Sequence, residues 1–390
     1  MTIITSSPLP AINSPRIKEL RLSEIPNCLN AYHMILGAEG RAVERNAEQD
    51  IISARVFGHL LLDFHAPPRI FGDKPCATLV KWIISPTQNP DRSQDDVVFI
   101  SGKLLCDKLL RLFRKSTALY AAPYSPPSCP SFEMQEEMTK YLMEASSKDY
   151  RTLRMKVLAR DGYRCMITGL FDEESYKRCA ELRTIARRDN VYKVVVQTSQ
   201  ILKESTMQGI DPAGTDEEGP MVNKTYHAAG AMTVLENLGL SDLTDAFKKA
   251  GGVHSIWNLL SLESNLHFKF NDLDLWFEQT DQEHRYNVCV LDELDEVYIH
   301  RNFSSAKNPV LGAPMVVDFT SNLETVPPPN PKLLALHAAC ARVAHMSGAT
   351  EFFDKIHRDA EEMEVLASDG SSAPLLDILI SPFAVIHGLA

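Results

Sequence analysis

Apolar residues recur at every third or fourth position in several segments of this chain, as they do on the buried face of an amphipathic helix. The first such segment covers residues 44–64, and consecutive prolines at 67 and 68 end it, because proline cannot continue a helix. The helices predicted from this pattern are residues 44–64, 98–114, 132–160, 232–238, 241–250, 331–348 and 350–366.

Short runs of β-branched residues indicate strands in the middle of the chain. The clearest run is residues 191–197 (VYKVVVQ), and residues 286–291 and 297–300 are similar. Residues 163–168 can form one arm of a tight hairpin, and residues 76–85 fit either a strand or a helix. Helices at both ends with strands between them predict an α+β fold.

Two proline-rich stretches divide the sequence. Residues 121–130 contain four prolines and residues 327–329 are three prolines in a row, so neither stretch can be part of a helix. The predicted organisation is a flexible tail at 1–16, a mainly helical N-terminal region at 17–120, a linker at 121–131, a central domain at 132–310 and a helical C-terminal region at 327–390.

Composition and charge narrow the class of protein. The chain has 390 residues, of which 44% are hydrophobic and 23% are charged, as in ordinary globular proteins. A net charge of −11 excludes a protein coated in positive charge for indiscriminate DNA binding. Residues 148–193 nevertheless hold twelve basic and seven acidic residues, so any surface that faces phosphate is expected there.

The eight cysteines are scattered, and no two of them have the Cys-x-x-Cys spacing of a zinc knuckle. We expect most of them to be reduced thiols in the core. The polar N-terminal residues do not have the pattern of a secretory signal, and no run of 18 apolar residues indicates a membrane span. We therefore expect an intracellular protein of the nucleus or cytoplasm, neither secreted nor membrane-bound.

Three segments carry a chemical signature. They are RDGYRCMITG at residues 160–169, TSQIL at residues 198–202, and the stretch from HSIWNLLSL at 254–262 to NLHFKFN at 265–271. Together these segments resemble the HNH endonuclease family, in the variant common in fungal proteins. The resemblance covers about residues 150–280, and residues 333–370 resemble the C-terminal tail of such proteins.

The resemblance implies a ββα-metal fold, in which a β-hairpin and a helix hold one divalent cation, Mg²⁺, Mn²⁺ or Zn²⁺. It also implies a histidine on the hairpin that acts as general base, an asparagine that positions this histidine, and a second histidine that binds the metal. An imidazole can accept a proton near pH 7, and the cation stabilises the charge that develops on the scissile phosphate.

Two of these positions are chemically weakened in this sequence. Gln200 stands where the family has the general base, and an amide does not accept a proton at neutral pH. Asn258 matches the middle asparagine, and His267 matches the metal-binding histidine. Asn271, one helical turn after His267, is a weaker ligand than the acidic residue or histidine common in the family.

Other interpretations of these residues stay open. His227 or His254 could supply the missing base, or the first could be a solvated loop residue and the second a turn residue. His267 could simply pack against the hairpin, and Asn258 could cap a helix or bind the backbone.

Basic residues around the first motif are the candidate contacts to nucleic acid: Arg151, Arg154, Arg160 and Arg164. The sequence therefore predicts an HNH nuclease-like protein whose metal-dependent hydrolysis of phosphodiesters is impaired by Gln200. One alternative is a non-catalytic scaffold of the same fold that binds nucleic acid or protein. Another is an accessory protein of a fungal metabolic pathway, since a fold does not determine a function.

Overall fold

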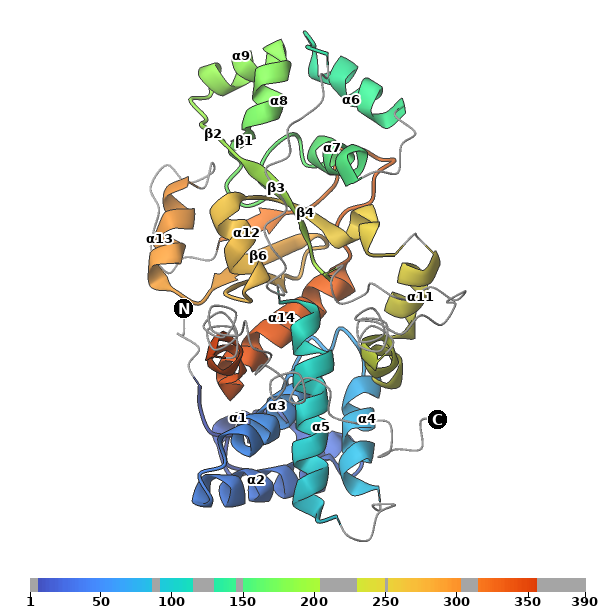
Figure 1. Cartoon of the computed structure of the whole chain (residues 1–390), viewed down its shortest axis with the longest axis vertical. Coiled ribbons are helices and arrows are strands. Elements are labelled where there is room, and N and C mark those ends of the chain that lie inside the picture. The colour runs from blue at the N-terminus through green and yellow to red at the C-terminus, as the bar shows by residue number, and fades with distance from the viewer. Residues whose placement is uncertain are drawn as a thin grey trace, which may run out of the picture. The chain divides into compact units, whose positions relative to one another are not determined.

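The structure is a computed structural model, and it describes residues 6–85, 92–114, 130–144, 150–203, 230–249, 252–302 and 315–355. The chain divides into two compact units, each assembled from separate stretches of sequence. The helical unit contains the described residues of Ile4–Leu112, Thr206–Thr244 and Arg342–Ala390. The mixed unit contains those of Phe113–Ser205 and Asp245–Ala341 (Figure 1).

The helical unit is arranged around α3 (Glu48–His65), most of whose residues are buried. Val56 and Leu60 have no exposed surface, because α2 (Cys28–Glu44) and α5 (Gln94–Lys108) pack against α3. The other elements of this unit are α1 (Pro15–Leu20), η1 (Leu22–Glu24), α4 (Lys74–Ile84), η2 (Leu110–Leu112), a helix at 230–237, the first part of α11 (Ser241–Lys249) and the last part of α14 (Pro331–Ser347).

The contact between α3 and α5 depends on a glycine. A Cβ atom at Gly102 would lie 2.0 Å from the carbonyl oxygen of Ser53, so only glycine allows the two helices to approach this closely. The predicted helices at 44–64 and 98–114 therefore exist, with shifted ends, as α3 and α5.

Residues 1–16 were predicted to be a flexible tail, and for residues 6–16, which the structure describes, this prediction is wrong. The backbone N–H of Leu9 donates to the two carboxylate oxygens of Glu39 at 3.1 and 3.3 Å, and Leu9 is 5% exposed. The hydroxyl of Tyr32 donates to the carbonyl oxygen of Pro10 at 2.7 Å. A buried carboxylate and a tyrosine of α2 thus hold this segment against the helices.

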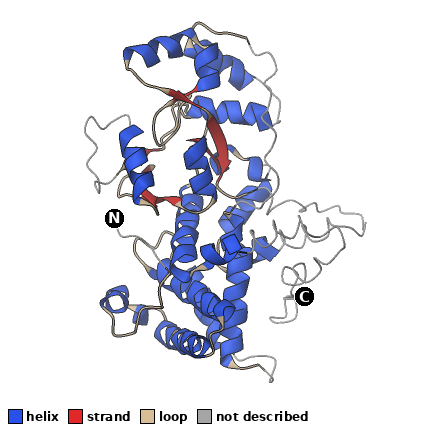
Figure 2. Cartoon of the chain, turned by 60° about the vertical axis from the view of Figure 1, so that its left-hand side comes forward, coloured by secondary structure: helices blue, strands red, loops and turns tan. Residues whose placement is uncertain are grey.

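The mixed unit contains three small sheets. They are β1 (Phe171–Asp172) parallel to β2 (Lys193–Val194), β3 (Val196–Gln200) antiparallel to β4 (Leu259–Glu263), and β5 (Leu275–Gln279), β6 (Arg285–Val290) and β7 (Val316–Asp318) antiparallel in that order. Figure 2 shows these strands in red among the more extensive helices, an arrangement that confirms the α+β class.

Helices surround these sheets. α12 (Ser264–Asn271) follows β4 directly and packs against β3, β4 and β5. The remaining elements are α6 (Gln135–Glu144), α7 (Tyr150–Arg160), α8 (Glu173–Arg178), α9 (Ala180–Arg188), η4 (Gly252–His254), η5 (Ile256–Asn258), α13 (Glu293–Asn302) and the other parts of α11 and α14. Across the described ranges, no helix is long and apolar enough to cross a membrane.

The strand predicted at 297–300 is wrong, because these residues lie inside α13. Asp292 Oδ1 accepts the backbone N–H of Leu294 at 2.8 Å and so satisfies one of the first amides of this helix. Three acidic residues in the first turn also interact favourably with the helix dipole: Glu293, Asp295 and Glu296.

The two units do not follow the linear order of domains predicted from the sequence. The division between Leu112 and Phe113 lies near the predicted boundary at residue 121. Residues 230–244, predicted as part of a central domain at 132–310, belong to the helical unit instead, and α14 is divided between the units after Ala341. Most of the predicted linker, residues 121–129, lies outside the described residues.

Candidate functional site

β3, β4 and α12 bring predicted site residues from distant parts of the sequence together. In the antiparallel pair, Gln200 at the end of β3 lies opposite Leu259 at the start of β4. α12 begins directly after β4 and carries His267 and Asn271 one turn apart. Two strands followed by a helix is the order of elements that the HNH resemblance implies.

Asn258 is fully buried and holds the backbone just after β3. Its Oδ1 accepts the N–H of Leu202 at 2.9 Å, and its Nδ2 donates to the carbonyl oxygen of the same residue at 3.0 Å. The carbonyl oxygen of Asn258 accepts the N–H of Ile201 at 2.8 Å. Asn258 therefore fixes the chain immediately after Gln200.

The side chain of Lys203 is buried between the end of β3 and α12, with 7% of the residue exposed. Its Nζ donates to the carbonyl oxygen of Gln200 at 2.5 Å and to Oδ1 of Asn271. The same atom lies 5.3 Å from the centre of the Phe270 ring, within the range of a cation–π interaction. A positive charge thus lies among two neutral oxygens and an aromatic face.

Asn271 connects this ammonium to His267. Its Oδ1 also accepts the hydroxyl of Ser199 at 3.2 Å, and the residue is 4% exposed. Its Nδ2 lies 3.3 Å from Nε2 and 3.4 Å from Nδ1 of His267. Asn271 therefore contacts both the ammonium of Lys203 and the imidazole of His267.

His337 of α14 also packs against Phe270. The two rings stack with centroids 3.9 Å apart and an interplanar angle of 4°. Burial, together with the positive charge of Lys203, lowers the pKa of His337 to about 3. His337 is therefore a neutral imidazole, and its Nε2–H donates to the carbonyl oxygen of Phe270 at 3.2 Å.

These residues do not fit a divalent cation. Zn²⁺, Mn²⁺ and Mg²⁺ bind carboxylates, thiolates or neutral imidazoles, whereas the residues predicted here are one imidazole, His267, and the amides of Gln200 and Asn271. Asn271 Oδ1 already accepts a hydrogen bond from an ammonium, which would repel a second cation. In the part of the chain that the structure describes, no three or more His, Cys, Asp or Glu side chains form a cluster able to hold a metal ion.

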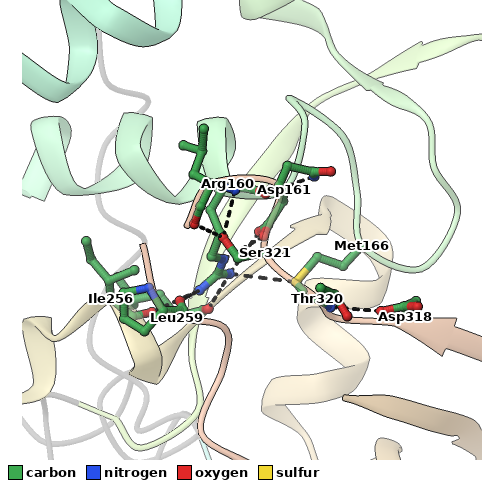
Figure 3. A network of polar contacts seen from close by, with 11 residues as sticks. Arg160, Asp161, Met166, Ile256, Leu259, Asp318, Thr320 and Ser321 are labelled. Atoms are coloured by element: carbon green, nitrogen blue, oxygen red, sulfur yellow. Dashed lines mark hydrogen bonds and ion pairs between the residues drawn. The ribbon is translucent and has the colours of Figure 1, made fainter. Parts of the chain in front are cut away.

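Arg160, predicted as a contact to nucleic acid, has no exposed surface. Its guanidinium forms a bidentate pair with Asp161, with Nε and one terminal nitrogen 2.6 and 2.9 Å from the carboxylate oxygens (Figure 3). The terminal nitrogens also donate to the carbonyl oxygens of Leu259 at 2.8 Å and Ile256 at 3.1 Å. This side chain joins α7, η5 and β4, and it cannot reach a phosphate without local unfolding.

Arg154 and Arg164 are also engaged within the fold. Arg154 donates to the carbonyl oxygen of Val196 at 2.8 Å, and one of its terminal nitrogens lies 3.3 Å from the buried Asp172. The guanidinium of Arg164 lies 3.7 Å from the centre of the Phe171 ring, and burial lowers its pKa. The side chain of Arg151 lies outside what the structure describes.

The structure does not test His227 as the base, and it describes His254 only at the edge of the motif. His227 lies outside the described residues, and His254 is exposed at the end of η4. Comparison with protein-family models, with curated proteins and with solved structures finds no match for this chain. The HNH resemblance therefore stays an expectation from the sequence motifs, with which the order of β3, β4 and α12 is compatible.

Sequence reasoning missed two residues of this site, Lys203 and His337. Lys203 lies only three residues after Gln200, so its closeness could have been recognised, although its burial could not. His337 contacts Phe270, which is 67 positions away in the sequence, and a local sequence pattern cannot predict such a contact.

Proposed function

We propose that this chain is a nuclease-like ββα protein that binds nucleic acid and lacks efficient phosphodiester hydrolysis, so that its fold serves as a non-catalytic scaffold. The observation that carries this proposal is the amide of Gln200 at the end of β3, in the place where the resemblance requires a base. Its backbone is fixed by Asn258 and is linked through Lys203 and Asn271 to His267.

The chemistry of the site supports the scaffold. Hydrolysis of a phosphodiester requires a group that takes a proton from water and a cation that stabilises the developing charge. Gln200 cannot take the proton. An ammonium such as that of Lys203 can attract a phosphate, but it cannot lower the pKa of a bound water as a metal ion does.

A different part of the mixed unit supports binding of nucleic acid. We call four residues the α9–β2 surface: Arg187 and Arg188 at the end of α9, Tyr192 just before β2, and Lys193 in β2. Tyr192 is 75% exposed, whereas Tyr163 and Tyr286 of the same unit are 0% and 1% exposed. Residues 177–193 contain six basic and two acidic residues, in a chain whose net charge is −11.

The backbone beneath the α9–β2 surface is firmly held. The N–H of Val191 donates to the carbonyl oxygen of Ala186 at 2.9 Å and closes the C-terminus of α9. The N–H of Phe171 donates to the carbonyl oxygen of Tyr192 at 3.1 Å. The exposed ring and its basic neighbours therefore project from a fixed turn, as a platform for an unpaired base flanked by phosphates would.

Metal-dependent hydrolysis is the competing function. The order of β3, β4 and α12 and the presence of His267 favour it, and a nicking assay separates the two. Plasmid DNA is incubated with Mg²⁺, Mn²⁺ or Zn²⁺ and with the natural protein, Gln200→His or His267→Ala. We expect no nicking above background by the natural protein. Nicking by the natural protein that His267→Ala abolishes would establish the nuclease instead.

Binding is tested separately, by fluorescence anisotropy with labelled single-stranded and duplex oligonucleotides. We expect the double variant R187E/R188E to weaken binding roughly tenfold or more and to lower its salt dependence, because two phosphate contacts are lost. Tyr192→Ala should weaken binding of single strands more than binding of duplex, because it removes a stacking ring.

The single variant Arg187→Glu is also measured, and its matched control is Arg21→Glu. Arg21 is exposed on the helical unit, with 77% of its side chain accessible, so this variant makes the same kind of charge change outside the α9–β2 surface. Equal losses in Arg21→Glu and Arg187→Glu would mean that general charge, and not this surface, determines binding.

A further inference from the structure

The position of Lys203 within the β3–β4–α12 motif carries an inference about what holds this motif together. Its Nζ is within hydrogen-bond distance of an oxygen at the end of β3, the Gln200 carbonyl, and of an oxygen on α12, Asn271 Oδ1. The strand and the helix that a metal would join are therefore already joined by one side chain.

The burial of Lys203 means that other groups must compensate its charge. A charged group loses its water when it is buried, and the loss must be offset by oxygens and aromatic faces that approach it closely. Lys203, 7% exposed, has two such oxygens and the face of Phe270 at 5.3 Å. These two oxygens are hard, neutral ligands, which suit an ammonium and would by themselves hold a dication only weakly.

We propose that the ammonium of Lys203 is the resident cation of the β3–β4–α12 motif: it takes the place of the divalent cation, joins the end of β3 to α12 without metal, and keeps a metal ion out. This inference rests on the proposed ββα assignment. It predicts that metal binding is blocked by Lys203 itself, and that the weak ligand at position 271 is a second, separate obstacle.

A cycle of four proteins tests the blocking. Zn²⁺ alone is titrated by calorimetry into the natural protein, Asn271→Asp, Lys203→Met and the double variant. In Asn271→Asp the new carboxylate pairs with Lys203, so we expect no site-specific Zn²⁺ binding. In the double variant the carboxylate and His267 are released for the metal, and we expect binding at least tenfold tighter than in Asn271→Asp. Adding His267→Ala to the double variant should abolish this gain.

Equal Zn²⁺ affinities of Asn271→Asp and the double variant would overturn the inference, as would stoichiometric Zn²⁺ binding by the natural protein that depends on His267. Circular dichroism checks that each variant is folded. If Lys203→Met unfolds, Lys203→Gln replaces it, since the amide keeps a hydrogen-bond donor without the charge.

A thermal melt gives a second readout. The melting temperature of the natural protein should be the same in excess EDTA and in equimolar Zn²⁺, because its cation is covalently attached. A change of more than about 2 °C between the two conditions would contradict the inference. The proposed function can fail independently of this inference. Metal-free cleavage of DNA would refute the non-catalytic scaffold and leave Lys203 as the resident cation. Zn²⁺ binding by the natural protein without cleavage would refute the resident cation and leave the scaffold.

Discussion

Arg160 and Lys203 are buried cations of the mixed unit that are compensated in different ways. Arg160, 0% exposed, faces the carboxylate of Asp161 at 2.6 and 2.9 Å and donates to further carbonyl oxygens. Lys203, 7% exposed, donates to a carbonyl oxygen and to an amide oxygen. The first charge lies against the carboxylate of its neighbour in sequence, whereas the second donates to two neutral oxygens.

The geometry of the two groups explains the difference. A guanidinium is a planar fork that can bind several oxygens in fixed directions, so Arg160 joins three segments of backbone at once. An ammonium is a compact point charge, which resembles a metal ion more closely. The motif RDG at residues 160–162 therefore has a structural explanation: Arg160 and Asp161 pair, and Gly162, at φ 65°, ends α7.

Removing the guanidinium should have the largest effect. Arg160→Met leaves the carboxylate of Asp161, whose side chain is 4% exposed, without its guanidinium partner and removes a donor from the carbonyl oxygens of Ile256 and Leu259. We expect the free energy of unfolding to fall by about 3–5 kcal/mol, as when one member of a buried ion pair is removed. Urea denaturation followed by circular dichroism measures this change.

Arg160→Lys is the matched control, because it keeps the charge and removes the fork. Stability near that of the natural protein in Arg160→Lys would show that charge alone matters, and the contrast drawn between the two cations would be wrong.

Removing the ammonium should have a smaller effect. Lys203→Met removes a donor from the carbonyl oxygen of Gln200, whereas Oδ1 of Asn271 still accepts the hydroxyl of Ser199. We expect a loss of about 1–3 kcal/mol, the range for buried polar groups deprived of a hydrogen bond. The same urea experiment measures it. A loss as large as that of Arg160→Met would mean that Lys203 neutralises a buried negative charge.

The fold was predictable where large apolar residues mark a helix face. α3 and α14 satisfy this condition and appear near their predicted positions. α2 was not predicted, although its buried positions have helical spacing, because several of them are small residues, Ala31, Ala38 and Ala42, or the charged Glu39. The strand predicted at 297–300 failed because the β-branched run is too short to outweigh an acidic N-terminal turn.

For the candidate site, the sequence predicted only which residues lie on which strand or helix. The motifs place Gln200 at the end of a strand and His267 and Asn271 on the following helix, and the structure has this arrangement. The burial of Arg160 was not predictable, because its partners include the carbonyl oxygens of residues 256 and 259, nearly one hundred positions away. A basic residue that is counted as surface charge in a sequence can thus be a central structural residue.

The smallest expected effect is the influence of the Lys203 charge on the pKa of His337. Because the pKa of His337 is lowered to about 3 in the folded state and is about 6.5 in an unfolded chain, only the unfolded state binds this proton between those pH values. Acidification from pH 6.5 therefore favours unfolding, by up to about 1.4 kcal/mol per pH unit for this group. His337→Gln should remove the contribution, and Lys203→Met should reduce it, because the pKa of His337 rises when the neighbouring charge is gone. Urea denaturation between pH 7 and pH 4 gives the slope of the free energy of unfolding against pH. Burial lowers the pKa of His59 in the helical unit to about 4, so His59 also contributes to this slope. Because His59 contributes equally to every variant, the slopes are compared between variants. Parallel slopes for the natural protein and Lys203→Met would show that the ammonium is screened from the imidazole, so that its charge is compensated at the site as completely as that of Arg160.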